Sequence, residues 1–202
     1  TEADASAITE ADLRAVLPRF QGEVSQIPPM VSAVHYEGKR LYELARQGVT
    51  VERQARTVQI DALEMSEFVP GVRARATLDV VCGKGTYIRT LCADLGAALG
   101  VGGHMATLRR TRVGGFDVLE AVPLDNVTET NVASLLLGPS AALAALPVHL
   151  ADDAQQVDVR HGRALPTDLP DGVTARVVDA ADTLLALARA QDGQLHPFKV
   201  FV

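Results

Sequence analysis

The chain has 202 residues, of which 48% are hydrophobic and 22% are charged, and its formal net charge is −6. Such a chain can bury a real hydrophobic core and has room for one larger domain and a small one. No apolar run approaches the roughly 20 residues that a membrane span needs, and Thr1–Ala7 lacks the basic and apolar regions of a signal peptide. Cys82 and Cys92 have neither Cys-x-x-Cys spacing nor a neighbouring His pair. The pattern therefore indicates neither a disulfide framework nor a zinc site, and it favours a reduced, cytoplasmic setting.

The distribution of charge is more informative than its total. Residues 73–116 hold seven Lys and Arg against two Asp and so carry +5, whereas residues 117–202 carry −7. A net acidic chain would ordinarily argue against a nucleic-acid partner, because Lys and Arg make the phosphate contacts. One basic zone between acidic flanks leaves two interpretations open, an RNA-binding surface or uneven surface charge.

A helix is predicted to begin after Thr9. The Thr9 side chain is of a type that caps helix N-termini, Asp12 occupies the third helical position, and Ile8 and Leu13 can form a hydrophobic staple. Pro18 is expected to end or kink this helix, because proline lacks a backbone N–H.

The following segment changes from extended chain to a short amphipathic helix. Pro28 and Pro29 favour an extended backbone, and a helix is predicted from Lys39 to about Gln47, where Gly48 ends it. The basic residues that face outward from it are Lys39, Arg40 and Arg46. From the residues alone this pattern fits either a solvated helix or a mobile basic arm.

The middle of the chain predicts two strands, a glycine turn and a helix. Thr57–Met65 is a strand candidate, and Val72–Cys82 alternates apolar and polar residues, as a half-buried strand does. Apolar residues then recur at helical spacing from Ile88 to Leu99. Ala106–Val113 is predicted as a further strand, because glycine pairs bracket it.

The last third predicts a connector followed by a small all-β module. Pro123–Pro147 is rich in Ala and Leu, and Gly138-Pro139-Ser140 divides it into two short helical pieces. Turn-forming His-Gly and Asp-Gly pairs separate four expected strands, Val157–Arg160, Val173–Val178, Thr183–Arg189 and Lys199–Val202.

Gly83-Lys84-Gly85-Thr86 stands where a strand turns into a helix. Free backbone N–H groups, the positive helix end and Lys84 could hold an anion there, and a plain tight turn is the alternative. The segment is neither a Walker A loop nor a complete Gly-x-Gly-x-x-Gly, because Ile88 occupies the position of the third glycine.

Tyr87 and Arg89 follow this turn directly. A cation in the first turn opposes the helix dipole, so a carboxylate partner is an obvious reason for Arg89, with a surface position or a structural ion pair as alternatives. Tyr87 is either a core residue or a flat, hydroxyl-bearing face on which a base can stack.

Further basic residues cluster at Arg109, Arg110 and Arg112. On the predicted strand Arg110 and Arg112 would share one face, which makes phosphate contacts credible. His35 and His104 lack the spaced Ser, Cys or carboxylate partner of a hydrolytic triad, so each is expected to be structural or an RNA contact.

Three blocks together resemble one known family. They are Pro28-Pro29-Met30-x-Ser32-Ala33 with Gly38–Gly48, then Gly85–Arg89, then Gly103-His104-x-x-x-Leu108-Arg109-Arg110. The sequence is similar to the bacterial tRNA pseudouridine synthases of the TruB family, which act on uridine 55 in the T loop. The similarity covers nearly the whole chain and weakens after Val148, where the family carries a PUA-like RNA-binding β module.

The resemblance implies an α+β fold, with a mixed, largely antiparallel sheet and flanking helices. Residues 1–122 would be the C-terminal part of the catalytic domain, residues 123–147 a helical connector, and residues 148–202 the PUA-like module. An RNA-binding arm would span about residues 28–56 and close over the T loop.

The resemblance also implies roles for single residues. Arg89 would pair with and orient a nucleophilic aspartate, Tyr87 would lie near a flipped base, and Leu108 would pack against that base. The implied RNA contacts are Lys39, Arg40, Tyr42, Arg46, Lys84, His104, Arg109 and Arg110. The implied partner is the T stem-loop of tRNA, bound by a monomer without membrane, metal or cofactor.

The implied reaction flips a uridine out, attacks it with an aspartate carboxylate, breaks the glycosidic bond and rejoins the base through carbon. The family carries this aspartate in a Gly-x-Leu-Asp-Pro-x-Ala-x-Gly segment, and no Leu-Asp-Pro occurs in these 202 residues. We therefore expect the chain to start inside the catalytic domain and to be inactive alone. The alternative is a non-catalytic RNA-binding or tRNA-folding protein.

Overall fold

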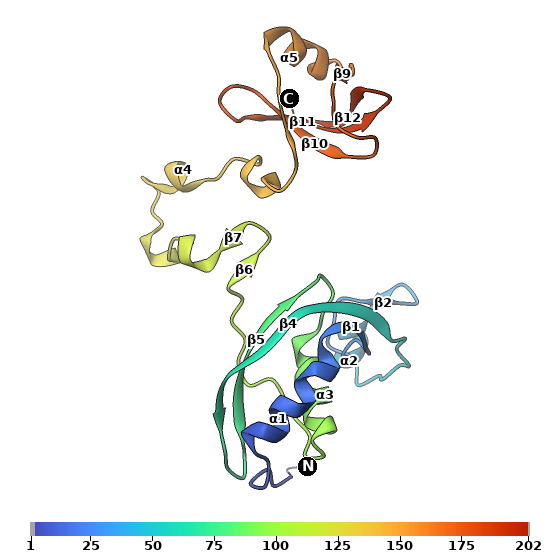
Figure 1. The fold of residues 1–202 in the computed structure, drawn as a ribbon, viewed down its shortest axis with the longest axis vertical. Coiled ribbons are helices and arrows are strands. Elements are labelled where there is room, and N and C mark those ends of the chain that lie inside the picture. The colour runs from blue at the N-terminus through green and yellow to red at the C-terminus, as the bar shows by residue number, and fades with distance from the viewer. Residues whose placement is uncertain (1–2, 202) are drawn as a thin grey trace. The chain divides into compact units, whose positions relative to one another are not determined.

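The structure is a computed structural model that describes residues 3–201. The chain forms two compact units, one ending at Leu108 and one beginning at Arg109 (Figure 1). Each unit has helices and strands of its own, and nearly all strand pairs are antiparallel. The predicted α+β class with largely antiparallel sheets is confirmed.

The elements of the first unit, in chain order, are α1 (Glu10–Val16), η1 (Leu17–Phe20), β1 (Gly22–Gln26), β2 (His35–Tyr36), β3 (Lys39–Arg40), α2 (Leu41–Arg46), β4 (Arg56–Val69), β5 (Arg75–Cys82) and α3 (Ile88–Ala98).

The predicted start of α1 is confirmed. The Thr9 hydroxyl accepts a hydrogen bond from the Asp12 N–H at 3.2 Å, and the Asp12 carboxylate accepts one from the Thr9 N–H at 2.9 Å. These two bonds satisfy N–H groups that the first helical turn leaves free. The α-helix ends at Val16, and the chain continues as a 3₁₀ turn that contains Pro18.

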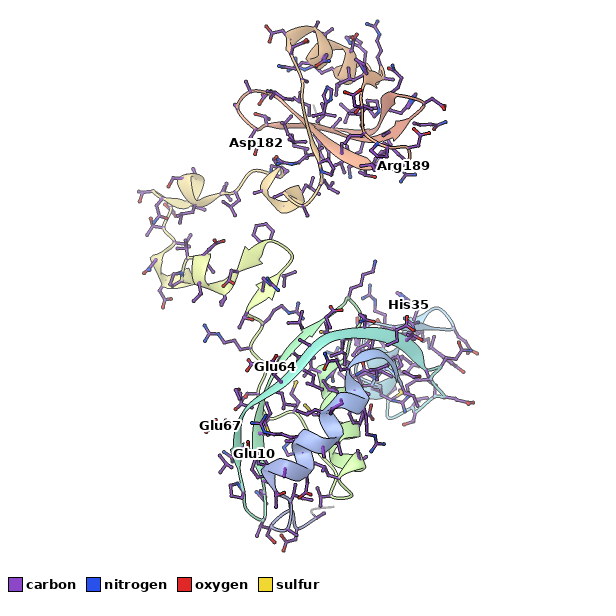
Figure 2. The ribbon with its side chains drawn as sticks, viewed as in Figure 1. Glu10, His35, Glu64, Glu67, Asp182 and Arg189 are labelled. Atoms are coloured by element: carbon purple, nitrogen blue, oxygen red, sulfur yellow. The ribbon has the colours of Figure 1, made fainter. Side chains whose placement is uncertain are left out.

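A three-stranded antiparallel sheet of order β1-β4-β5 is the scaffold of this unit. The helices α1 and α3 lie on one of its faces (Figure 1). The core between helices and sheet consists of Leu13, Leu17, Ile60, Leu63, Met65, Leu91 and Leu95. On the other face, Glu64 and Glu67 are exposed and point away from the helices (Figure 2). Glu64 is directly opposite Asp79 of β5, so this outer face is acidic.

The end of α3 lies very close to the chain that follows it. A Cβ atom at Gly96 would come within 2.1 Å of the backbone of Gly102, and one at Gly103 would come within 2.4 Å of the Cys92 carbonyl oxygen. Only glycines permit this approach, because no side-chain carbon fits in that space. The approach fixes the start of the 102–111 segment against α3.

The predicted strand Ala106–Val113 is wrong over most of its length. Residues 102–111 form no regular secondary structure, and only Arg112–Val113 is a strand, β6, which pairs with β7 (Phe116–Asp117). The reason is that residues 106–111 are exposed and lie beside no partner strand, so the glycine pairs that bracket the segment are not enough to make it a strand. Arg110 and Arg112 therefore do not share one face of a strand.

The elements of the second unit, in chain order, are β6 (Arg112–Val113), β7 (Phe116–Asp117), η2 (Val118–Glu120), η3 (Leu124–Asn126), α4 (Val132–Leu135), η4 (Ala141–Leu143), β8 (Val148–Leu150), α5 (Asp153–Arg160), β9 (Leu165–Pro166), β10 (Thr174–Val178), β11 (Leu184–Gln191) and β12 (Gln194–Val200). Gly138-Pro139-Ser140 separates two short helical pieces, α4 and η4, as predicted.

The C-terminal part of this unit is a five-stranded sheet of order β8-β10-β11-β12-β9 with α5 packed against it. The predicted strands Val173–Val178 and Thr183–Arg189 are confirmed as β10 and β11, whereas β12 begins five residues before the predicted Lys199. The predicted strand Val157–Arg160 is wrong, because it belongs to the helix α5.

The cause of this error is a helix signal upstream of the predicted strand. The Asp152 carboxylate accepts a hydrogen bond from the Gln155 N–H at 2.8 Å, and the Gln155 side chain accepts one from the Asp152 N–H at 3.1 Å. This capping box starts α5 and makes Val159 a buried helix residue. The module is therefore not all β. Across residues 3–201, no helix combines the length and apolarity that crossing a membrane requires.

Candidate functional site

The first turn of α3 is positioned by the glycine turn that precedes it. At one end of that turn the Gly83 N–H donates to the Gln59 carbonyl of β4 at 2.9 Å. Gly85 has a φ of +87°, a backbone conformation that favours glycine. Tyr87 is the N-cap residue of α3, and its carbonyl accepts the Leu91 N–H at 3.0 Å. Arg89 follows within the first helical turn and is exposed.

A segment from Gln26 to Ala33, here called the strap, runs along this first turn and is bonded to it at three points. The buried Gln26 side chain bonds the Tyr87 backbone, the Thr90 hydroxyl donates to the Ile27 carbonyl at 3.4 Å, and the Arg89 guanidinium donates to the Val31 carbonyl at 2.6 Å. The strap and the first turn of α3 are thereby joined, although they are some 60 residues apart in sequence.

The strap leads into the arm predicted over residues 28–56. A β2–β3 hairpin turns at Glu37 and Gly38, which both have positive φ, and α2 follows immediately. The Tyr42 N–H donates to the Ser32 carbonyl at 3.0 Å, which fixes the start of α2 to the strap. Leu41 is the buried residue of α2, and the predicted helix start at Lys39 is two residues too early because Lys39–Arg40 forms β3.

A pocket of about 680 Å³ lies between α3, the strap and α2. Its lining residues are Val31, Ser32, Ala33, Tyr42, Ala45, Arg46, Tyr87 and Arg89. We call the Tyr87–Arg89 side the α3 wall and the Tyr42–Arg46 side the arm wall. Each wall contributes one tyrosine and one arginine, and the Arg46 guanidinium lies 5.3 Å from the centre of the Tyr42 ring.

This arrangement suits a ligand that is both flat and anionic. Tyrosine rings offer faces on which a base can stack, and arginines bind phosphate or carboxylate oxygens through paired N–H groups. The volume falls within the range of small-ligand pockets, roughly 300–1,000 Å³. Among residues 3–201, no Asp or Glu forms an ion pair with Arg89, which therefore lines the pocket without a carboxylate partner from this part of the chain.

Four of the residues singled out in the sequence are brought together in this pocket, namely Tyr42, Arg46, Tyr87 and Arg89. Lys39 and Arg40 are exposed on β3, and Lys84 is exposed on the glycine turn. His104 and Leu108 are exposed on the irregular segment after α3, where Leu108 has 57% of its surface accessible. Arg109 and Arg110 are exposed in the second unit.

Sequence reasoning missed Gln26. Its side chain is 1% exposed and contacts the backbone of Tyr87. A glutamine at the end of a strand is usually solvent-facing, and the local signal is limited to alternation, which puts Gln26 on the same face as the half-buried Val24. A second omission is Ser32, whose hydroxyl is buried on the pocket wall without a hydrogen-bond partner among the described residues.

The other ionisable groups of α3 lie outside the pocket lining. Burial raises the pKa of the Cys92 thiol, because the interior disfavours the thiolate, and burial likewise raises the pKa of the Asp94 carboxyl. Within the described residues no three His, Cys, Asp or Glu side chains gather in a way that could hold a metal ion.

Two family models match consecutive parts of the chain. The model described as TruB family pseudouridylate synthase (N terminal domain) matches residues 1–88, and the model described as tRNA pseudouridylate synthase B C-terminal domain matches residues 89–137. The chain belongs to the TruB family. Its two matched parts meet between Ile88 and Arg89, inside the first turn of α3.

Named relatives agree with this membership. The chain is 48% identical over 163 residues to tRNA pseudouridine synthase B of Symbiobacterium thermophilum and 44% identical over 193 residues to that of Thiobacillus denitrificans. These alignments include 81% and 94% of this chain but 54% and 63% of the relatives. The chain thus spans less than two thirds of the length of these two relatives.

Solved structures give the same fold. A structure titled "Crystal Structure of a Cbf5-Nop10-Gar1 Complex" matches with a TM-score of 0.73 and 25% identity, over 99% of this chain and 64% of the other. A second, titled "Structure of H/ACA RNP bound to a substrate RNA containing 2'-deoxyuridine", matches with a TM-score of 0.70 and 22% identity, over 99% and 63%.

Proposed function

We propose that this TruB-family chain is part of a tRNA pseudouridine synthase that converts uridine 55 in the T loop to pseudouridine. The observation that carries the proposal is the pocket in which Tyr87 and Arg89 face Tyr42 and Arg46. The flipped uridine lies in this pocket with Tyr87 near the base, while Leu108, which is outside the pocket lining, packs against the base from the segment after α3. Stacking on aromatic faces is how proteins commonly hold unpaired bases.

Arg89 has the role of orienting the nucleophile. An aspartate carboxylate from the family's Gly-x-Leu-Asp-Pro segment, outside the 202 residues, pairs with the Arg89 guanidinium. A guanidinium that pairs with a carboxylate keeps it ionised and aimed at the sugar or base. The hydrogen bond from Arg89 to the Val31 carbonyl uses one N–H group and leaves a second edge of the guanidinium for the carboxylate.

The reaction balances without a cofactor. The bond between ribose C1′ and base N1 breaks while the aspartate forms a covalent adduct, and the base rotates within the pocket. A bond then forms between C1′ and base C5 as the bond to the aspartate breaks and returns the free carboxylate, the hydrogen on C5 leaves as a proton, and N1 takes up a proton. Release of tritium from C5-labelled uridine therefore reports each turnover.

The RNA is held mainly by basic residues. On the arm these are Lys39, Arg40 and Arg46, with Tyr42 beside Arg46, and outside the arm the further contacts are Lys84, His104, Arg109 and Arg110. The acidic outer face that carries Glu64 and Glu67 repels phosphate, which favours approach from the pocket side. Residues 148–202 act as a PUA-like RNA-binding module after a connector at 123–147. The enzyme works as a cytoplasmic monomer.

Tritium release from tRNA labelled at C5 of uridine tests this function. The full-length protein is expected to release tritium from position 55, and residues 1–202 alone are expected to bind tRNA without release. Release by residues 1–202 alone would show that the nucleophile lies within them. Binding without release by the full-length protein would favour a non-catalytic tRNA-binding or tRNA-folding protein.

A further inference from the structure

Gln26 occupies an unusual position for an amide side chain. It is the last residue of β1 and is 1% exposed. Its Oε1 accepts a hydrogen bond from the Tyr87 N–H at 2.9 Å, and its Nε2 donates to the Tyr87 carbonyl at 3.3 Å. One side chain thus bonds both backbone groups of a residue 61 positions away. A buried amide is tolerated in a protein interior when its polar atoms are paired in this way.

The backbone that leads into Tyr87 makes few other contacts. Between Gly83, which bonds β4, and Tyr87, residues 84–86 make no hydrogen bond to the rest of the described chain. The Thr86 hydroxyl is buried without a partner, and Gly85 has no neighbour within 4 Å of a Cβ position. The backbone that enters α3 is therefore fixed at Tyr87 by Gln26.

Gln26 itself is rigidly placed by the sheet. It is paired with Arg56 of β4 in the antiparallel β1–β4 ladder. A continuous path of contacts runs from the sheet through the Gln26 amide to the N-cap of α3, from which the Tyr87 and Arg89 side chains enter the pocket. A residue within the first turn of a helix moves with the helix end, so a shift at Tyr87 displaces Arg89 as well.

We propose that Gln26 is a positioning residue, which sets the α3 wall for the reaction without touching the substrate. The inference rests on the proposed function, because it assigns Gln26 to the geometry of Tyr87 and Arg89 in that chemistry. Small displacements of groups that orient a reacting atom cost rate, with a 1 Å error reaching roughly a hundredfold. Substrate binding is governed by the exposed basic residues and is expected to change little.

The test substitutes Gln26→Met, which keeps the apolar stem and length but removes both hydrogen bonds. Gln21→Met is the matched control, because the Gln21 amide donates to the Asp61 carbonyl at 3.1 Å from an exposed site away from Tyr87. In the full-length enzyme, Gln26→Met is expected to lower kcat by roughly tenfold to a hundredfold with KM for tRNA within about threefold. Gln21→Met is expected to leave both unchanged.

A second measurement tests the two hydrogen bonds between the Gln26 amide and the Tyr87 backbone, here called the clamp, and needs no catalysis. In residues 1–202, hydrogen exchange of the Tyr87 amide is expected to accelerate roughly tenfold in Gln26→Met, because its acceptor is lost. Gln26→Glu retains an acceptor for this N–H and serves as the second variant should the Met variant fail to fold. Its Tyr87 exchange and its kcat are expected to lie between those of wild type and Gln26→Met.

The possible results separate the two claims. Absence of turnover by the wild-type full-length protein overturns the proposed function, while Tyr87 exchange still reports on the clamp. Wild-type turnover with a Gln26→Met kcat within twofold of it overturns the positioning role. Unchanged hydrogen exchange of the Tyr87 amide in the folded variant overturns the clamp itself. A rise in KM as large as the expected loss of kcat, with kcat unchanged, shows that Gln26 serves RNA binding instead.

Discussion

The two walls of the pocket are built in different ways. The α3 wall, with Tyr87 and Arg89, rests on a helix whose Leu91 and Leu95 are buried in the core and whose N-terminus is bonded to the sheet through Gln26. The arm wall, with Tyr42 and Arg46, rests on a six-residue helix with a single buried residue, Leu41. Leu41 lies outside the core cluster of the β1-β4-β5 sheet.

This difference matches two different tasks. A group that orients a nucleophile must be held to a fraction of an ångström, and a buried helix with paired backbone groups provides that. A surface that recruits RNA gains affinity from exposed charge, which tolerates a looser support. We therefore expect changes in the α3 wall to reduce the rate of reaction and changes in the arm wall to reduce affinity.

The largest expected effect is at Arg89. In the full-length enzyme, Arg89→Ala is expected to lower kcat by roughly a hundredfold to a thousandfold, because an oriented charged group is lost from the reacting centre. The dissociation constant for tRNA, measured by filter binding, is expected to stay close to the wild-type value. Arg14→Ala is the control, because Arg14 forms an exposed ion pair with Glu10 on α1. Loss of affinity in parallel with rate would place Arg89 among the RNA-recruiting residues.

Two Leu→Ala substitutions compare how firmly the α3 wall and the arm wall are supported. Leu91→Ala is expected to lower the free energy of unfolding by about 2–5 kcal/mol, because Leu91 is fully buried in the core. Leu41→Ala is expected to lower it by less, since Leu41 lies outside the core cluster of this unit. Urea unfolding of residues 1–202 measures both. Equal losses would show that the arm is part of the same cooperative core.

A smaller effect is expected from charges on the arm. The double substitution Lys39→Ala and Arg40→Ala is expected to raise the dissociation constant for tRNA by roughly tenfold and to reduce its salt dependence, because two phosphate contacts are lost. The kcat at saturating tRNA is expected to be unchanged. Measuring the dissociation constant for tRNA at several salt concentrations checks this, in a variant that keeps Arg73 and Arg75. An unchanged salt slope would remove these residues from the RNA-binding surface.

The last expected effect, which involves neither catalysis nor RNA binding, concerns the reactivity of Cys92 on α3. Burial raises the pKa of this thiol, so less of the reactive thiolate is present at a given pH than in an exposed cysteine. With Cys82→Ser as background, iodoacetamide is expected to alkylate Cys92 roughly tenfold more slowly than in the same chain unfolded in urea. The rate should climb as pH rises toward the raised pKa. Equal rates in the folded and unfolded chain would mean that α3 does not shield Cys92.

Local signals in the sequence predicted the scaffold well. The capping pair Thr9 and Asp12, the alternation of β5 and the glycine turn before α3 all lie within a few residues of what they determine, and the structure confirms them. The family motifs also indicated Tyr87 and Arg89, which line the pocket.

Contacts that depend on the tertiary fold were not predictable. The hydrogen bonds of Gln26 depend on a residue 61 positions away, which no local pattern identifies. Residues 106–113 are bracketed by glycine pairs but have no partner strand over most of their length. The error at Val157–Arg160 is different, because the Asp152–Gln155 capping box that makes this segment helical is a local signal.

The central claim, that the pocket receives the target uridine, is tested most directly by photocrosslinking. A T stem-loop RNA with 4-thiouridine at position 55 is bound to residues 1–202 and irradiated, and the crosslinked peptide is identified by mass spectrometry. We expect the crosslink on the α3 wall, at or next to Tyr87, and expect a competing unmodified T stem-loop to abolish it. A crosslink confined to residues 148–201 would contradict the claim, because the target base would then lie away from Tyr87 and Arg89.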